Sequence, residues 1–291
     1  MSATVTAPGG RPVSSRTAER VSVRPVTFVR VLRSEWIKFW TLRSTWWTLG
    51  ATVVLMVGLA LLFAMAISAI PADDTAAQEG MAAGGVVGPT IVTLGSEFAQ
   101  LVVAVLGALV VTGEFSTGMI RSTFAAIPGR ISALWAKLVV LLAVTAVVSA
   151  VGVALAYVAT AGMLDDLGLP VDFGDADQVR ALVGAVLYLM AVAAFSLGVG
   201  ALLRHTAASI GVLMAVFFVL PIVFQIIVAA SGADWAVDVN AYLPSVAGEQ
   251  IMSGGPTQEG RLEPWTGFSV LAGYTAALLA AAAVSLKTRD A

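Results

Sequence analysis

Six long runs of uncharged or nearly uncharged residues constrain the fold of this chain more than any other feature. Each is long enough for a helix to cross a hydrocarbon core of about 30 Å, which takes roughly 20 residues. A composition of 58% hydrophobic and 12% charged residues supports the same class. The sequence therefore predicts an all-α integral membrane protein with spans at about 46–70, 90–112, 134–162, 181–203, 207–230 and 265–286.

The distribution of cationic residues predicts the orientation of these spans. Eight of the sixteen Lys and Arg residues precede residue 44, three lie around the connection between the second and third spans, and Arg204, Lys287 and Arg289 fall on the same side. Only Arg180 and Arg261 remain for the other side. Because cationic residues gather in cytoplasmic loops, both termini are expected in the cytoplasm. Residues 1–26 lack periodicity and are predicted to be a disordered tail, followed by a single membrane domain at 27–291.

The segment from Thr27 to Arg43 is typical of a helix that lies in the membrane interface. It combines two Trp with four cationic residues, and apolar and polar side chains fall on different helical faces. An alternative, compatible with the first, is a basic juxtamembrane helix that only sets the topology. The residues predicted to carry the interfacial role are Arg30, Arg33, Trp36 and Lys38.

A short polar connection between the second and third spans is predicted to form a cytoplasmic helix. Ser116 and Thr117 are expected to cap its start, and Pro128 to end it. Its apolar face and basic flanks suit contact with a soluble partner, which we hypothesise moves the membrane part. The candidate coupling residues are Glu114, Ser116, Thr117, Ile120, Arg121, Phe124 and Ile127.

Two acidic residues at the second span are candidate functional groups. Thr93, Glu97 and Gln100 are spaced to share one helical face, and a carboxylate at that depth is costly unless it faces protein or water. They are candidates for a substrate path or subunit seam, or Glu97 is hydrated near the surface or protonated. Glu114 is expected to pair with Arg121 or with a basic residue of the Arg30–Arg43 segment, or else to be solvated.

Two further polar features lie in the second half of the chain. Pro221 should kink the fifth span, either statically or as a hinge, and Gln225 one turn later is added to the candidate path. The long connection 231–263 is expected to contain a short helix starting at Pro244 that dips into the outer leaflet. Five Asp residues between Asp165 and Asp177 favour a solvated loop over a Ca²⁺ site, since the ligand pattern of an EF-hand is missing.

Motifs for enzymatic chemistry are missing from the sequence. The chain has no Cys and a single His, and it contains neither a G-x-S-x-G nor an H-E-x-x-H motif. None of its three Lys residues follows a Gly, so there is no phosphate-binding P-loop. The chain is therefore not expected to be an enzyme, and any energised function needs another subunit.

Three local strings, in order, resemble the permease subunit of type-2 ABC transporters, the exporter group. Ser34-Glu-Trp-Ile-Lys38 with Leu42-Arg-Ser-Thr-Trp46-Trp is similar to the opening of actinobacterial permeases of this kind. The string that begins at Glu114 is similar to their E-[YF]-x-x-G-T-[IW]-R segment, with Met119 in place of the usual Thr. Tyr242-Leu-Pro-Ser-Val-Ala-Gly248 is similar to their L-P-S-x-A-G stretch. The resemblance covers nearly the whole chain, from about Phe28 to Leu286.

The resemblance implies an ATP-driven permease in a bacterial cell membrane. Two six-span subunits, identical or not, would pair, and each would bind an ATP-binding-cassette ATPase that holds ATP and Mg²⁺; this chain itself would bind no cofactor and no nucleic acid. The coupling helix and the interfacial helix would be the two ATPase contacts. The mostly apolar spans favour export of a hydrophobic or amphipathic substrate. The alternatives are a non-transporting membrane scaffold and an intramembrane enzyme.

Overall fold

The computed structural model describes residues 27–71, 75–76, 80, 84–120, 122 and 130–288, and within these ranges the chain is helical without strands. Six described segments are long and apolar enough to cross a membrane, which confirms the predicted all-α membrane fold. They are α2 (Arg43–Ser68), α4 (Gly88–Ser116), α6 (Arg130–Asp166), α7 (Ala176–Leu203), the composite of α8 (Thr206–Met214), η1 (Ala215–Val219) and α9 (Leu220–Ser231), and α12 (Pro264–Thr288).

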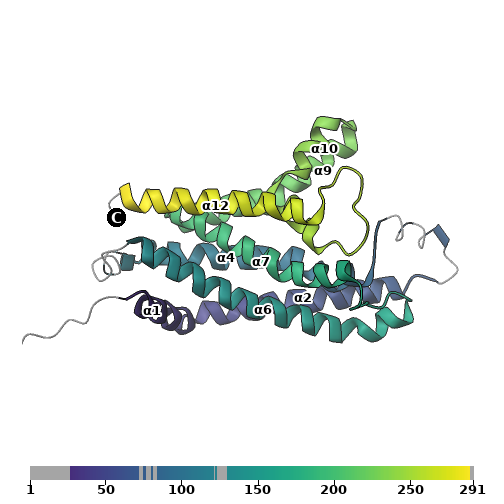
Figure 1. Ribbon diagram of the computed structural model, residues 1–291, viewed down its shortest axis with the longest axis horizontal. Coiled ribbons are helices and arrows are strands. Elements are labelled where there is room, and N and C mark those ends of the chain that lie inside the picture. Colours follow the sequence, from purple (N-terminus) through teal and green to yellow (C-terminus); the bar gives the residue numbers. More distant parts are fainter. Residues whose placement is uncertain are drawn as a thin grey trace, which may run out of the picture.

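Five of these helices, α2, α4, α6, α7 and α12, run along the long axis of the molecule (Figure 1). The short helix α1 (Phe28–Thr41) lies at the end of the bundle where α12 finishes, so α1 and the C-terminus share one end. This end is called the inner end below, and the opposite end the outer end. Helix α7 is the most buried span and packs on α4, α6 and α12, whereas the fifth span is the least buried.

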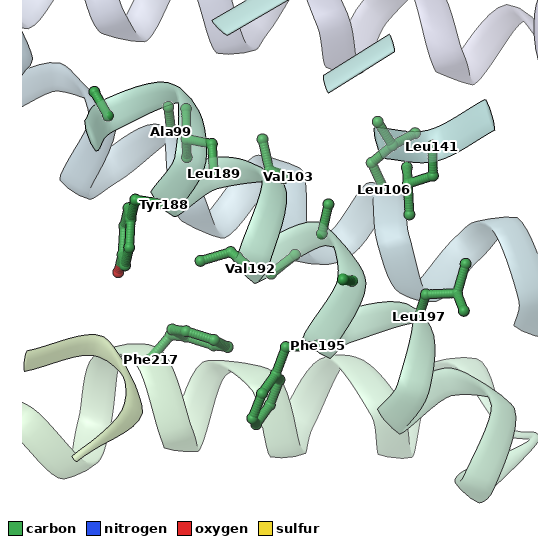
Figure 2. Close-up of a cluster of buried hydrophobic side chains, with 14 of the residues drawn as sticks. Ala99, Val103, Leu106, Leu141, Tyr188, Leu189, Val192, Phe195, Leu197 and Phe217 are labelled. Atoms are coloured by element: carbon green, nitrogen blue, oxygen red, sulfur yellow. The ribbon is translucent and has the colours of Figure 1, made fainter. Parts of the chain in front are cut away.

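The contact between α4 and α7 forms the centre of the core. A Cβ added to Gly107 would lie 2.7 Å from the Ala193 carbonyl oxygen, and one added to Gly200 would lie 3.1 Å from that of Ala108. Small residues at such crossings let membrane helices approach closely and gain van der Waals contact. Figure 2 shows the apolar side chains that fill the space around this contact; among them are Ala99, Val103, Leu106, Leu189, Val192 and Leu197.

The residues at the helix ends explain two of the connections between helices. Arg204 ends α7 in the left-handed region at φ 54°, and the ring of His205 accepts a hydrogen bond from the Ala208 N–H at 3.3 Å to cap α8. Arg204 and His205 therefore form a tight turn between the fourth and fifth spans. In the acidic loop, the carboxylates of Asp172 and Asp175 accept backbone N–H groups of Gly174 and Asp177. These two carboxylates shape a turn and a helix cap.

The fifth span departs from regular α-helix just before Pro221. Residues Ala215–Val219 form a π-helical turn, and the N–H of Leu220 bonds to the Ala215 carbonyl. Because Pro221 has no N–H to donate, a wider turn beside it accommodates the lost hydrogen bond. The irregularity predicted from the proline is thus spread over one turn on its N-terminal side.

The long outer connection holds α10 (Asp234–Ala241), α11 (Pro244–Glu249) and the 3₁₀ turn η2 (Gln250–Met252). The short helix expected at Pro244 is present, with the proline in its first turn. Val246 and Ile251 are buried, and α11 and η2 pack mainly on α7 and α12. Entry of this helix into the outer leaflet stays a prediction.

Candidate functional site

Four charged side chains meet at the inner end of the bundle, where α1, α4 and α6 come together. The Lys137 ammonium lies 2.6 Å from Glu35 and 2.6 Å from Glu114. The Lys38 ammonium lies 3.0 Å from each of the same two carboxylates. The four groups therefore form a closed ring of alternating charge, which we call the inner charge ring.

The inner charge ring is buried and electrically balanced. Glu35, Glu114 and Lys137 are each no more than 5% exposed, whereas the Lys38 side chain is 35% exposed. Burial disfavours the charged form of Lys38, but its hydrogen bonds to Glu114 and Glu35 outweigh this and raise its pKa above the ordinary value. Two acids and two bases satisfy each other's charge, the condition under which buried ions are tolerated.

The sequence of α1 explains how Glu35 reaches this position. Val31, Glu35 and Phe39 are spaced by one helical turn and form the buried face of α1. Beside the ring, Val31 packs on Ala133 and Ala136 of α6. Contact with α6 and the charge ring together attach α1 to the end of α4 and the beginning of α6. These are the two helices that flank the predicted coupling segment.

A second contact extends this attachment to the rest of the inner end. The guanidinium of Arg204 lies 5.3 Å from the ring centroid of Phe115, a cation–π distance. The same guanidinium donates to the Ser285 carbonyl of α12 at 3.1 Å. The turn between α7 and α8, the last turn of α12 and the end of α4 are therefore connected next to the charge ring.

The predicted coupling segment lies only partly within the described residues. Ser116 and Thr117 do not cap a following helix, as the sequence had suggested: both hydroxyls donate to the Gly113 carbonyl, at 3.0 and 2.8 Å, and so close the end of α4. The error arose because a hydroxyl can bond backward to the preceding turn as readily as it can cap the next helix.

Beyond Thr117 the backbone turns at Gly118, which has φ 71°. Met119, Ile120 and Ser122 are then helical, and Ile120 is buried. Three predicted coupling residues lie outside the described residues: Arg121, Phe124 and Ile127. The coupling role of the segment stays a prediction.

The predicted interfacial residues divide into two groups. Arg30, Arg33 and Trp36 are exposed on α1, away from its buried face. Lys38, which was predicted as an interfacial residue, instead points into the inner charge ring. Glu114 therefore pairs with a basic residue of the Arg30–Arg43 segment, as one of the predicted alternatives had it, and that residue is Lys38. A contact between Glu114 and Arg121 lies outside the described residues.

The candidate path residues are not brought onto one surface. Thr93 and Gln100 are buried, whereas Glu97 is exposed on the protomer. The amide of Gln100 donates to the Glu97 carbonyl at 2.6 Å and to the Glu249 carboxyl at 3.2 Å. Gln225 is exposed on α9, a helix that packs mainly on α10 and η1. Their role as a substrate path stays a prediction.

Sequence reasoning missed four participants in these polar clusters: Glu35, Lys137, Tyr188 and Glu249. Glu35 and Lys137 carried a usable signal, because opposite charges at the inner edges of several helices can pair. Tyr188 and Glu249 carried little signal, since their contact depends on how α7 and the outer connection pack. The hydroxyl of Tyr188 donates to Gln100 and, at 3.3 Å, to Glu249.

Comparison with known protein families identifies one match that covers most of the chain. A family model described as ABC-2 family transporter protein matches residues 31–291. That range contains α2 to α12, nearly all of α1, and every residue of the inner charge ring. A search of curated proteins found no match.

Proposed function

Because this chain belongs to the ABC-2 family of transporter proteins, and so is a membrane-spanning permease that works with an ATP-binding subunit, we propose that it exports a hydrophobic or amphipathic substrate. Two copies, or this chain and a related one, form the permease pair in a bacterial cell membrane. ATP and Mg²⁺ are bound by the partner ATPase. Export rather than import is supported by the likeness of three local strings to exporter permeases.

The observation that carries the proposal is the inner charge ring. The family's two expected ATPase contacts, the interfacial helix and the coupling segment 116–127, lie far apart in the sequence, since Lys38 and Glu114 at their near ends are 76 positions apart. Through Glu35 and Lys38, α1 is nevertheless fastened to Glu114 of α4 and Lys137 of α6, which flank the coupling segment. A displacement of the coupling segment by the ATPase would therefore move α1, α4 and α6 together, as a two-state element requires.

Reversal of the charge at Arg121 tests this function. We expect Arg121→Glu to lower copurification of the ATPase and substrate-stimulated ATP turnover by at least tenfold, because the residue lies in the predicted contact. Lys287→Glu is the matched control: it reverses one exposed charge at the same end of the bundle, on α12, and should leave both measurements within twofold. Unchanged ATPase binding after deletion of residues 116–127 would refute the assignment of the coupling segment.

The cytoplasmic location of both termini can be tested by thiol labelling, since the chain contains no Cys. In intact cells, a membrane-impermeant maleimide should label Gln258→Cys in the outer connection. It should label Ser122→Cys only after the cells are opened. Both positions are exposed, so access to the residue does not decide the result. Labelling of Ser122→Cys from outside would reverse the orientation and remove the proposed ATPase contact.

A further inference from the structure

A second polar cluster lies toward the outer end of the bundle, where α4, α7 and α11 meet. The Glu249 carboxyl accepts hydrogen bonds from the Gln100 amide at 3.2 Å and from the Tyr188 hydroxyl at 3.3 Å. Figure 2 shows the Tyr188 hydroxyl pointing away from Ala99 and Leu189. Gln100 also bonds to the backbone of Glu97. We call Glu97, Gln100, Tyr188 and Glu249 the outer polar cluster.

The backbone holds Glu249 in a fixed position. A Cβ at Gly184 of α7 would overlap the Ile251 carbonyl, and a Cβ at Gly267 of α12 would overlap the Ala247 carbonyl. Gly248 is equally confined by Tyr188 and Leu271. The segment that carries Glu249 is thus wedged between α7 and α12 at closest approach, so the cluster belongs to the packed core and not to a loose loop.

The outer polar cluster has more acid than base. Glu97 and Glu249 supply two carboxyls, and within the described part of the chain Arg261 is the one cationic side chain whose charge acts on both. Among the described residues, no ion pair joins Arg261 to either carboxyl. Both hydrogen-bond donors to the Glu249 carboxyl are neutral. A surplus carboxyl near an apolar span is costly unless it takes up a proton or another cation.

An independent observation concerns the buried hydroxyl of Ser245 on α11. Ser245 is 1% exposed, and its buried hydroxyl has no hydrogen-bond partner within the described part of the chain. Ser245 precedes Glu249 by one helical turn, so the two side chains lie on the same face of α11. Buried hydroxyls are normally hydrogen-bonded, and an unpaired one beside a surplus carboxyl fits a polar or cationic guest.

The chemistry of the cluster selects the kind of cation. Divalent metal ions in proteins need more carboxylate or imidazole ligands, and no group of three such side chains comes together in the described ranges. Two carboxyls beside an amide, a phenol and a hydroxyl suit an organic cation instead. Phe98, next to Glu97, is 46% exposed on the protomer and offers an aromatic surface to the apolar body of such a molecule.

We propose that Glu97 and Glu249 form a cation-binding site, with Gln100, Tyr188 and Ser245 as its neutral partners, that takes the positively charged group of an amphipathic organic cation. This inference rests on the proposed transport function and narrows its substrate class from hydrophobic or amphipathic molecules to lipophilic cations. Glu97 lies on the surface and contacts the organic cation first, and the buried Glu249 then binds its positively charged group.

Equilibrium binding of a permanent lipophilic cation tests the site. The full-length chain is placed in lipid nanodiscs and titrated with radiolabelled tetraphenylphosphonium. We expect saturable binding to the wild type, at least tenfold weaker binding to Glu249→Gln, and at least threefold weaker binding to Glu97→Gln and Ser245→Ala. Glu259→Gln, a change of an exposed acid in the same connection, should bind as the wild type does.

The outcomes separate this inference from the proposed function. Equal binding to the wild type and Glu249→Gln would mean that the probe only partitions into lipid, and would overturn the cation site. The ATPase association measured with the same preparations would remain intact in that case, so the transporter assignment would stand. A matching melting temperature for Glu249→Gln and the wild type at pH 6 excludes misfolding as the cause of weaker binding.

Discussion

The two polar clusters of this protein differ in how their charges are balanced. The inner charge ring pairs two carboxylates with two ammonium groups at 2.6–3.0 Å. The outer polar cluster sets two carboxyls against one more distant guanidinium and otherwise uses neutral donors. A balanced buried ring needs no further charge and serves to hold helices together. An unbalanced one is completed only by a proton or a bound cation, which is a property of a binding site.

The largest effect is expected from removing the most buried cation of the inner charge ring. Lys137→Met leaves Glu35 and Glu114 buried, with the partly exposed Lys38 as their one remaining cationic partner among the described residues, and breaking such a pair costs about 3–5 kcal/mol. We expect a large fall in melting temperature in detergent, measured by fluorescence-detected size exclusion. The double variant Glu35→Gln with Lys137→Met restores the balance and should recover part of the loss. Equal melting of Lys137→Met and the wild type would show that the ring does not fasten the helices.

An intermediate effect is expected from pH at the outer polar cluster. Glu249 lies outside the six spans, and its burial together with the nearby charge of Glu97 raises its pKa to about 8. The folded protein thus binds this proton more tightly than the unfolded chain, whose carboxyl has an ordinary pKa near 4.5. The contribution of Glu249 to the free energy of unfolding is therefore largest below the ordinary pKa and is lost as pH rises toward 8.

The measurement is the melting temperature between pH 5 and pH 9. The titratable and charged groups that face Glu249 are Glu97 of α4, Tyr188 of α7 and Arg261 of the outer connection. Glu249→Gln should reduce the fall of the melting temperature with rising pH, because the amide does not titrate. Tetraphenylphosphonium should also bind more tightly at pH 9 than at pH 6, since the cation competes with the proton. An identical pH profile for wild type and Glu249→Gln would contradict the unbalanced character of the cluster.

The smallest effect is expected at the exposed edge of the inner charge ring. Lys38 is partly solvated, so water replaces much of the electrostatic stabilisation that its ammonium gives the ring. Exposed ion pairs stabilise a protein by about 0–1 kcal/mol. Lys38→Met should therefore lower the melting temperature far less than Lys137→Met. If the two substitutions destabilise equally, the charge supplied by α1 is as critical as the one supplied by α6, and the exposure of Lys38 does not weaken its contribution. Lys287→Met, which removes an exposed cation outside both clusters, provides the baseline.

Much of the fold could be predicted because a bilayer imposes simple rules on sequence. A span must be apolar for about 20 residues, so the six helices follow from hydropathy. A local signal also worked at Pro244, which starts α11. These features depend on a residue and its immediate neighbours along the chain.

Side-chain roles that depend on a partner were predicted less well. The pattern of α1 predicted that Lys38 lies in the membrane interface, and the hydroxyls of Ser116 and Thr117 suggested the start of a helix. In each case a local pattern allowed two outcomes. The choice was made by a neighbour that the pattern does not contain: the Glu114 carboxylate for Lys38 and the Gly113 carbonyl for the hydroxyls.

The sequence by itself determined that this chain crosses a membrane six times, that its inner connections are basic, and that it belongs with ABC-2 transporters. Only the tertiary structure decided which charges meet. Glu35 and Lys137 are separated by 102 positions and Gln100 and Glu249 by 149, and each pair is joined by helix packing at glycines and other small residues. The length of an apolar span is set by consecutive residues, whereas the balance of charge depends on groups that only folding brings together.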